Sequence, residues 1–470
     1  MSKPTLQIEM PDSYWAERTY IVRVLFEEFL GFQVQLQKHS HSNVIITARD
    51  HRQLVIADTL FSTPKHLWLT PTSLPKQPLE IWDLGNTTLS PRLVHTDIPI
   101  IFGDDPENPY FLNQSEDQVY VGLDIFGSTF FMLTRYEEVV KPERDIHNRF
   151  PASASLAYQE NFLVRPIVNE YIEILWHCML LLWPRLERRH HSFQIYVSHD
   201  VDEPFRYAFS GPQRLLKRCV GDIVRRKSPR ALAKSIQSWL SVKQGNLKSD
   251  PCNVFDFIMQ VSEQQGLKSA FYFIADHTCH PIDGDYDLSH PVMRSLLSEI
   301  HQRGHEIGLH TSFNTYQDQP QTQQEVDILK TICAEEHITQ KQWGGRQHCL
   351  RWSTPKTWQN LNNSGLDYDT TLSFAEHIGF RCGTCFEFPV FNLLTSQSLQ
   401  LYERPLIVME ATVLQEKSMN LKISSGEAFK AINSMKMTCH LFSGNFTLLW
   451  HNSHLTTSEE KDLYQQILVS

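Results

Sequence analysis

The sequence predicts an α/β fold, a (β/α) barrel that need not be regular or complete, preceded by a smaller α+β domain. Its 470 residues are too many for one ordinary hydrophobic core, and a composition of 41% hydrophobic and 20% charged residues is typical of a globular protein. From residue 193 onward, strand-like apolar runs alternate with helical stretches of roughly 10 to 20 residues, as in parallel sheets. We therefore expect an α+β module over residues 1–190 and a barrel over residues 191–470.

The N-terminal module begins with a strand, a helix and three further strands. Apolar residues alternate over Leu6–Met10 and then recur at helical spacing over Ser13–Phe29. Three more strand-like runs follow, at Phe32–Leu36, Val44–Thr47 and Leu54–Ala57. Three prolines then mark a loop, Pro71, Pro75 and Pro78. Helical spacing returns in two stretches, Gly127–Val140 and Leu163–Leu182.

The boundary between the two parts is a polar, basic stretch, Glu187–Ser192, which precedes a strand over Phe193–Asp202. Two helices, Leu215–Arg226 and Ala231–Val242, form a predicted insertion at about residues 210–250. Five more helices are predicted, at Phe255–Gln265, Val292–Arg303, Gln323–Glu335, Pro355–Asn363 and Gly426–Met435. They alternate with five predicted strands, at Ala270–Ile274, Glu306–His310, Gln342–His348, Leu406–Val413 and Phe446–His451.

The charge balance argues against nucleic acid as a partner. The formal charge is −10, which gives no reason to approach phosphate backbones or acidic lipid. One local run, Arg214–Arg230, is basic, and we interpret it as a solvated helix face, with a phosphate-bearing or membrane-surface ligand as the alternative. No window is long and apolar enough for a transmembrane segment, and the start has no secretory signal, so we expect a cytoplasmic protein.

The cysteines are predicted to be reduced thiols. There are nine, an odd and scattered set that does not indicate a disulfide framework. Only Cys382 and Cys385 form a C-x-x-C pair. Without a second pair at zinc-finger spacing, a structural zinc site or a redox couple is the minor alternative there.

Two aspartates at the end of one predicted strand are the first candidate site. Every second side chain of a strand shares a face, so Ser198, Asp200 and Asp202 point one way while Val197 and His199 point the other. Barrels build their active sites at such strand ends. Two carboxylates this close call for a cation to neutralise them. The alternative is that Asp202 caps the segment that follows.

The second candidate motif is Gly304-His-Glu-Ile-Gly-Leu-His310. It is not the zinc motif of a metallopeptidase helix, because the residue four after His305 is Leu309 and Gly308 disfavours a helix. In a strand, His305 and His310 fall on opposite faces. We expect only His310 to share a pocket with Asp202, and His305 to be a hydrogen-bonded structural histidine.

These motifs resemble those of a known family, the polysaccharide deacetylases, which are carbohydrate esterases of the NodB-homology type (carbohydrate esterase family 4). Ser198–Asp202 is similar to the first family motif and Gly304–His310 to the second. Later counterparts follow in the same order over about residues 193–455, at Arg346–Trp352, Asp367–Thr371 and Leu449–Asn452. Two more segments, Asp124–Glu138 and Gly379–Cys385, resemble a subgroup that carries an additional N-terminal module.

The resemblance implies a metal-dependent amidohydrolase that removes an N-acetyl or other N-acyl group from a sugar in surface polysaccharide or glycan biosynthesis. It assigns catalysis to Asp200 as the base, His451 as the acid and Arg346 as the partner of Asp200. It assigns the metal, zinc or alternatively cobalt or manganese, to Asp202, His310 and Asn314. The implied substrate-binding residues are His348, Arg351, Trp352, Asp369, Arg381 and Leu449. Among these, Trp352 and Leu449 would form an apolar wall for the acyl methyl group, and Asp369 would support His451.

One departure from the family pattern concerns the metal. Asn314 stands where the family has its second metal-binding histidine. An amide oxygen is a weaker ligand than imidazole, so metal binding would be weakened or absent, or another ligand such as His348 would be recruited.

Other interpretations of the same residues stay open. His451 could be a core histidine, and Arg346, Arg351 and Arg381 could be surface or sulfate-binding arginines. A non-catalytic sugar-binding protein would explain the loss of the second histidine. A glycosyltransferase that binds a metal diphosphate through Asp200 and Asp202 would explain the aspartate pair but not His310 or His451. For an enzyme without an export signal, we expect an N-acylated sugar on a nucleotide or lipid carrier as the substrate.

Overall fold

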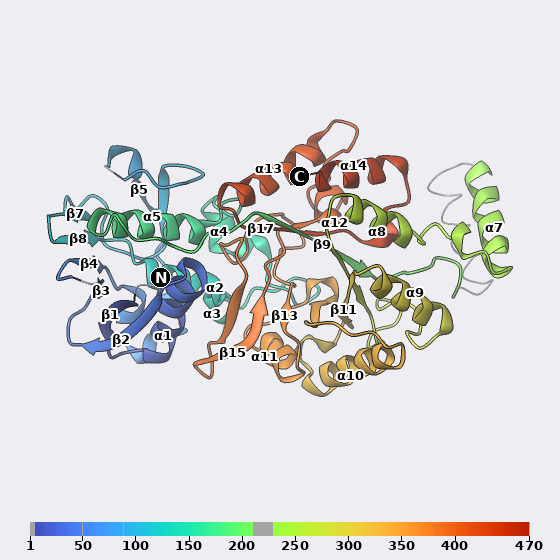
Figure 1. Cartoon of the computed structure of the whole chain (residues 1–470), viewed down its shortest axis with the longest axis horizontal. Coiled ribbons are helices and arrows are strands. Elements are labelled where there is room, and N and C mark those ends of the chain that lie inside the picture. Colours follow the sequence, from blue (N-terminus) through green and yellow to red (C-terminus); the bar gives the residue numbers. More distant parts are fainter. Residues whose placement is uncertain (1–4, 49, 88, 210–228, 470) are drawn as a thin grey trace.

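The computed structural model describes residues 5–48, 50–87, 89–209 and 229–469. The predicted helix Leu215–Arg226 and nearly all of the basic run Arg214–Arg230 lie outside these residues. Figure 1 shows an elongated molecule, with the N-terminal module at one end and helix α7 (Pro229–Lys243) at the other.

The N-terminal module is an α+β domain built on a mixed six-stranded sheet, in agreement with the predicted class. The strands lie in the order β2-β1-β3-β4-β8-β7, with parallel pairs β1–β2 and β4–β8. The strands are β1 (Thr5–Pro11), β2 (Gln33–His39), β3 (Val44–Thr47), β4 (Gln53–Ile56), β7 (Leu112–Gln114) and β8 (Gln118–Val121). A separate hairpin, absent from the prediction, comprises β5 (Glu80–Asp83) and β6 (Asp97–Ile100).

The helices of the module are α1 (Trp15–Arg23), α2 (Ile125–Leu133), α3 (Tyr136–Val140), α4 (Leu156–Gln159) and α5 (Ile167–Leu182). A π-helix, η1 (Val24–Leu30), continues α1, and the short 3₁₀ turns are η2 (Leu60–Ser62), η3 (Lys65–Leu67), η4 (Pro71–Ser73), η5 (Leu84–Asn86) and η6 (Ala152–Ala154). The single helix predicted over Gly127–Val140 is two helices. Arg135 breaks it with a φ of 54°, because its buried side chain turns to bind Glu137, Glu138 and the carbonyl oxygen of Arg381.

The C-terminal part is a mixed α/β structure around a nine-stranded sheet. The strand order is β14-β15-β13-β12-β11-β10-β9-β17-β16, and every neighbouring pair except β14–β15 is parallel. The strands are β9 (Gln194–Val201), β10 (Ser269–Phe273), β11 (Glu306–Thr311), β12 (Gly344–Gln347), β13 (Tyr368–Asp369), β14 (Phe388–Asn392), β15 (Gln397–Glu403), β16 (Val408–Met409) and β17 (Asn445–Leu449). Within the described residues, the edge strands β14 and β16 do not pair, so this sheet does not close.

Helices follow most of these strands. Besides α7 they are α8 (Phe255–Gln264), α9 (Pro291–Gln302), α10 (Gln319–Glu335), α11 (Lys356–Asn363), α12 (Glu410–Leu414), α13 (Glu427–Leu441) and α14 (Ser458–Leu468). Short 3₁₀ turns are η7 (Leu247–Ser249), η8 (Thr315–Gln317), η9 (His348–Leu350) and η10 (Asn452–His454). The strand predicted over Leu406–Val413 is wrong: only Val408–Met409 is a strand, and helix α12 follows at once. A short apolar run does not distinguish a buried strand from a buried helix.

The side chains of β9 alternate as predicted. Ser198 and Asp200 lie on the same face of the sheet, where both side chains bind Arg346. His199 faces the other way, stacks on Phe271 and makes a hydrogen bond with the carbonyl oxygen of Trp450. Because β9, β11, β12 and β17 are parallel neighbours or near neighbours, the residues that follow them gather at one end of the sheet.

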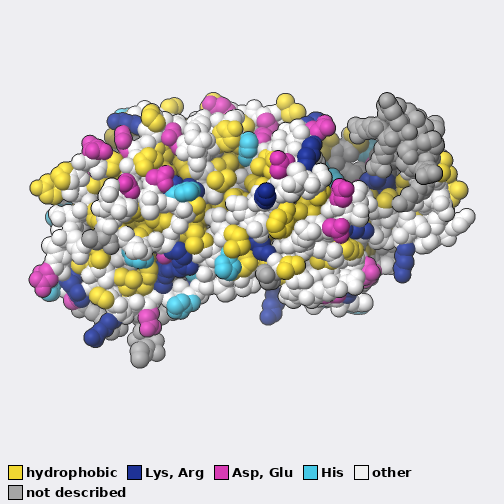
Figure 2. Space-filling view, turned by 90° about the horizontal axis from the view of Figure 1, so that it is seen from above, with side chains coloured by type: hydrophobic (Ala, Val, Ile, Leu, Met, Phe, Trp, Pro, Cys, Tyr) yellow, Lys and Arg dark blue, Asp and Glu magenta, His cyan; other side chains and the backbone are white. Residues whose placement is uncertain are grey.

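The surface carries both charge signs. On the face shown in Figure 2, acidic and basic side chains are interspersed among hydrophobic and neutral ones. Among the described residues, no helix combines the length and the apolar character needed to cross a bilayer.

Candidate metal centre and active site

Asp200 and Arg346 form a buried ion pair at the centre of the site. Arg346 Nη1 donates to Asp200 Oδ1 at 2.7 Å, and both side chains are almost inaccessible. The other guanidinium nitrogens donate to Ser198 Oγ at 2.9 Å and to the carbonyl oxygen of Thr370 at 2.9 Å. The arginine thus neutralises Asp200 and holds one of its oxygens, which leaves Oδ2 facing His310 Nε2 at 3.7 Å. The structure brings these two predicted catalytic residues together.

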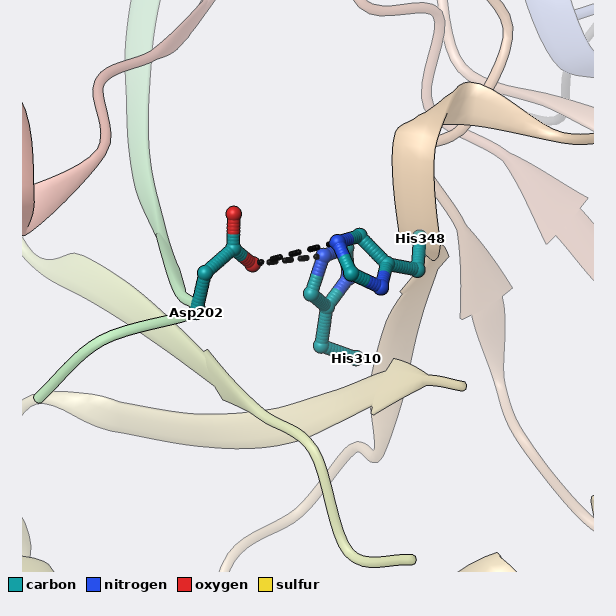
Figure 3. A group of neighbouring side chains, drawn as sticks. All are labelled: Asp202, His310 and His348. Carbon is teal, nitrogen blue, oxygen red and sulfur yellow. Dashed lines mark ion pairs between the residues drawn. The ribbon is translucent and has the colours of Figure 1, made fainter. Parts of the chain in front are cut away.

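Beside this pair, Asp202, His310 and His348 form a group that could hold a metal ion (Figure 3). Their ligand atoms lie within 4.8 Å of one another. Asp202 Oδ1 is 3.3 Å from His310 Nε2 and 3.7 Å from His348 Nε2. Asp202 Oδ1 and His310 Nε2 are buried without a hydrogen-bond partner. Buried polar atoms are rarely left unsatisfied, and one divalent cation would satisfy both.

The two histidines are oriented by hydrogen bonds to their other ring nitrogens. His310 Nδ1 lies 2.8 Å from the carbonyl oxygen of Arg346, and His348 Nδ1 lies 2.9 Å from Asp283 Oδ1. With the proton on Nδ1 in each ring, Nε2 keeps its lone pair for the centre of the group. This is the usual support of metal-binding histidines in proteins.

The charges of the group favour a cation at its centre. Burial alone would raise the pKa of Asp202, but the facing imidazoles, His348 foremost, hold it far below its usual range. Burial would lower the pKa of His348, but the carboxylates of Asp202 and Asp283 raise it well above its usual value. Carboxylates that stabilise a proton on an imidazole also stabilise a metal ion in its place.

The structure does not bring Asn314, predicted as a metal ligand, into this group. Its Nδ2 donates to the carbonyl oxygen of Thr278 at 3.0 Å, and its Oδ1 accepts from Arg351 Nη1 at 3.1 Å. The side chain is exposed, and both its amide nitrogen and its amide oxygen are hydrogen-bonded to groups outside the candidate metal centre. His348, expected as a substrate contact with recruitment as a metal ligand as the alternative, lies in the group, because turn η9 carries it from the end of β12 toward Asp202.

His451 lies on the opposite side of Asp202. Its Nε2 is 3.8 Å from Asp202 Oδ2, and its Nδ1 is 2.6 Å from Glu410 Oε1. Burial lowers the pKa of His451, but Glu410 outweighs it and, with Asp202 and Asp200, raises that pKa to about 10. The same Glu410 oxygen accepts from the backbone N–H of His451 and lies 2.7 Å from His454 Nδ1. These contacts also place Glu410, His451 and His454 within reach of a shared cation.

Glu410 replaces the predicted partner of His451. Asp369, expected in that role, instead accepts from the hydroxyl and backbone N–H of Thr371. Burial raises the pKa of Asp369 to about 6. The sequence pattern does not single out Glu410, because it predicts a strand over Leu406–Val413, although an acidic residue inside an otherwise apolar run is a signal for a buried functional carboxylate.

The other predicted substrate contacts are buried in the protein. Trp352 packs on Trp358 with ring centroids 4.7 Å apart, and Leu449 belongs to a small apolar cluster with Leu350 and Leu406. Arg381 pairs through two nitrogens with Glu138 of the N-terminal module, at 2.6 and 2.9 Å. Arg351 and Arg346 are also buried, so none of the three arginines is a surface residue. The geometry gives Arg381 a structural role between the modules.

A cleft of about 200 Å³ lies beside Asp202. Its lining combines apolar side chains, including Phe205, Phe209, Ile282 and Tyr286, with the acidic residues Asp202, Glu203 and Asp285. The apolar lining residues carry no periodic signal in the sequence, because they come from the loops after β9 and β10. The cleft offers room for a ligand next to the candidate metal centre.

The two cysteines of the C-x-x-C pair, Cys382 and Cys385, are buried free thiols. Within the described residues, neither belongs to a group that could hold a metal ion. His305 is also remote from the site, since its Nδ1 accepts from the backbone N–H of Ser269.

Comparison with known proteins identifies two segments of the chain. Residues 249–368 match the polysaccharide deacetylase family, and residues 6–184 match a family of unknown function (DUF7033). The predicted resemblance is therefore confirmed over residues 249–368, with an additional module before that domain. The matched range contains His310 and His348, and the fold brings Asp202 and His451, which lie outside it, to the same place.

Two solved structures are similar over part of the chain. One, from Mycobacterium smegmatis, is assigned to the polysaccharide deacetylases, with 11% identity and a TM-score of 0.39 over 59% of this chain and 83% of that one. The other is PuuE allantoinase, with 10% identity and a TM-score of 0.33 over the same shares. No curated protein matches the chain. At these values the two structures say nothing about the substrate of this protein.

Proposed function

We propose that the polysaccharide deacetylase domain of this chain is a divalent-metal amidohydrolase that removes an N-acyl group, acetyl in the simplest case, from a sugar. We further infer that its open nine-stranded sheet is an incomplete (β/α) barrel of the type found in that family. One observation carries the proposal: Asp202 Oδ1 and His310 Nε2 are buried, unsatisfied and 3.3 Å apart, next to a buried carboxylate. A cation would satisfy these two atoms, and the neighbouring carboxylate of Asp200 could act as the general base.

Asp202, His310 and His348 would hold the ion, preferably zinc, for which two imidazoles and a carboxylate are a common ligand set. When bound, such an ion polarises a carbonyl and lowers the pKa of water.

Asp200 is positioned to accept the proton of the attacking water. Arg346 holds its Oδ1 at 2.7 Å, while Oδ2 faces the ligand group at 3.7 Å from His310 Nε2. Because Arg346 occupies Oδ1, the oxygen of Asp200 that can accept a proton is Oδ2, which faces the candidate metal ligands. Such positioned proton transfer is worth about 10² to 10⁴ in rate.

His451 is positioned to protonate the leaving amine, because an amide anion leaves poorly. Its Nδ1 proton is engaged by Glu410, so Nε2 is the nitrogen that faces Asp202. His451 and Asp200 therefore approach the centre from different sides, as an acid and a base for one bond require.

The cleft beside Asp202 supports an N-acylated sugar as the substrate. Its aromatic and aliphatic lining would pack against the faces of a sugar ring and an acyl methyl group. A nucleotide or lipid carrier attached to the sugar would extend out of the cleft.

The proposal is tested by metal analysis of the purified chain together with acetate release from a set of N-acetylated sugars and nucleotide sugars. We expect stoichiometric zinc, loss of acetate release after chelation, and recovery with Zn²⁺, Co²⁺ or Mn²⁺. Release of UDP without acetate would indicate a glycosyltransferase instead. Saturable sugar binding without any release would favour the non-catalytic alternative, which the exposed Asn314 makes worth testing.

A second expected outcome concerns Glu410. Glu410→Gln removes the carboxylate that holds His451 Nδ1, so kcat should fall about 10-fold or more, in line with a weakened general acid, while zinc content stays unchanged. Glu410→Asp should recover part of the rate. Glu427→Gln, a matched change in the first turn of α13, is the control. A Glu410→Gln enzyme with wild-type kcat would show that Glu410 does not position His451.

A further inference from the structure

We infer that the N-terminal module supports the metal site from outside: Arg149, in the loop between α3 and η6, positions the turn that carries His348. The inference rests on the proposed metal site and assigns a role to the segment matched by the family of unknown function. Arg149 does not reach the ligand group itself. It acts through the backbone of the residue next to His348.

The turn that presents His348 is strained. Cys349 has φ 57° and ψ 21°, and Leu350 has φ 54°, so two successive non-glycine residues lie in the left-handed region. This conformation is unfavourable for side chains with a Cβ atom, and it persists where surrounding contacts hold it. His310, in contrast, lies on the regular strand β11, whose neighbours hold its backbone. His348 is therefore the ligand that needs support from outside.

Arg149 provides that support. Its Nη1 donates to the carbonyl oxygen of Cys349 at 2.8 Å. The arginine is itself held by Asp145, which accepts from Arg149 Nε at 2.8 Å and from its backbone N–H at 2.9 Å. Asp145 also accepts from the backbone N–H of His147 at 2.8 Å, so the loop over residues 145–149 forms a closed, internally bonded unit. A donor fixed in this way holds the Cys349 peptide in one orientation.

A second contact ties the far end of the turn to the same loop. Arg351 Nε donates to the carbonyl oxygen of His147 at 2.8 Å. The Arg351 guanidinium lies over the ring of Phe313, 4.0 Å from its centroid, and donates to the carbonyl oxygen of that residue. The strained turn is thus held at Cys349 and at Arg351 from the side of the N-terminal module.

On the inner side, one carboxylate oxygen links the turn to the rest of the site. Asp283 Oδ1 lies 2.9 Å from His348 Nδ1 and accepts from the backbone N–H of Phe313 at 2.7 Å. The imidazole is therefore fixed from inside by Asp283 and its backbone from outside by Arg149. Release of the outer contact should let the turn relax and move His348 away from Asp202.

The experiment measures zinc affinity of the full-length apoprotein by competition with a chromophoric chelator. Arg149→Ala should weaken binding about 10-fold, the range seen when the support of a metal-binding histidine is lost. Arg149→Lys, which cannot hold both Asp145 and Cys349, should also weaken it and serves as the second variant if Arg149→Ala does not fold. Arg144→Ala is the matched control and should leave the zinc affinity unchanged, because within the described part of the chain Arg144 donates to carbonyl oxygens of its own module.

A double-mutant cycle separates positioning from general destabilisation. If Arg149 acts through His348, then Arg149→Ala with His348→Ala should bind zinc no more weakly than His348→Ala alone. Additive losses, or wild-type affinity in folded Arg149→Ala and Arg149→Lys, would overturn the inference while leaving the proposed function intact. A wild-type chain that binds no zinc would instead overturn the proposed metal site, and this inference with it.

Discussion

Asp200→Asn is expected to lower kcat for acetate release by about 10³-fold, the loss that follows removal of a positioned general base. Asparagine has nearly the shape of aspartate, and its Oδ1 can still accept from Arg346 Nη1, so the site should keep its geometry. It has no basic oxygen to take a proton from water. The loss should therefore appear in kcat, with zinc content and KM close to wild type.

The measurement is a steady-state acetate-release assay with zinc content determined on the same samples. Asp256→Asn is the matched control, because Asp256 lies on α8 with its side chain 84% exposed and pairs only with Arg303 among the described ion pairs. The buried Arg346 loses its neutralising partner in Asp200→Asn, so a lower melting temperature is also expected. Retention of more than a tenth of the wild-type kcat by folded, zinc-loaded Asp200→Asn would exclude Asp200 as the base.

His348→Ala is expected to weaken zinc binding by roughly 100-fold or more. This exceeds the loss expected when a residue that only orients a metal ligand is removed. Asn314→Ala should leave zinc affinity within about 2-fold of wild type, because the Asn314 amide faces Thr278 and Arg351 rather than Asp202. The two substitutions separate the ligand set of this structure from the one that the family motif implies.

Both variants are compared with wild type by chelator competition, and a melting curve establishes that each is folded. His301→Ala, a histidine in the last turn of α9, controls for the loss of an imidazole. The reverse ranking, with Asn314→Ala the weaker binder, would mean that the third ligand comes from the β11 loop and that His348 contacts substrate.

The strand-end part of the site could be predicted because it depends on local periodicity. Alternation along β9 places Ser198 and Asp200 on one face with His199 on the other, and the odd separation of His305 and His310 puts them on opposite faces. In a parallel sheet these strand ends meet at one edge whatever the loops do. The sequence alone therefore predicts that Asp200, Asp202 and His310 lie close together.

The amino-acid sequence by itself determined the α/β class, the alternation of strands and helices and the facing of side chains along each strand, since all of these follow from short-range patterns. It also carried the family resemblance over about residues 193–455, of which the family match covers residues 249–368. Only the tertiary structure decided that His348 joins Asp202 and His310 and that Glu410 rather than Asp369 lies beside His451. It also decided that Arg149 of the N-terminal module binds the carbonyl oxygen of Cys349, next to His348. These three outcomes depend on loop conformations and on contacts between residues 41 to 200 positions apart. A left-handed turn held from another module leaves no periodic signal, because its stability comes from partners that only folding brings within bonding distance.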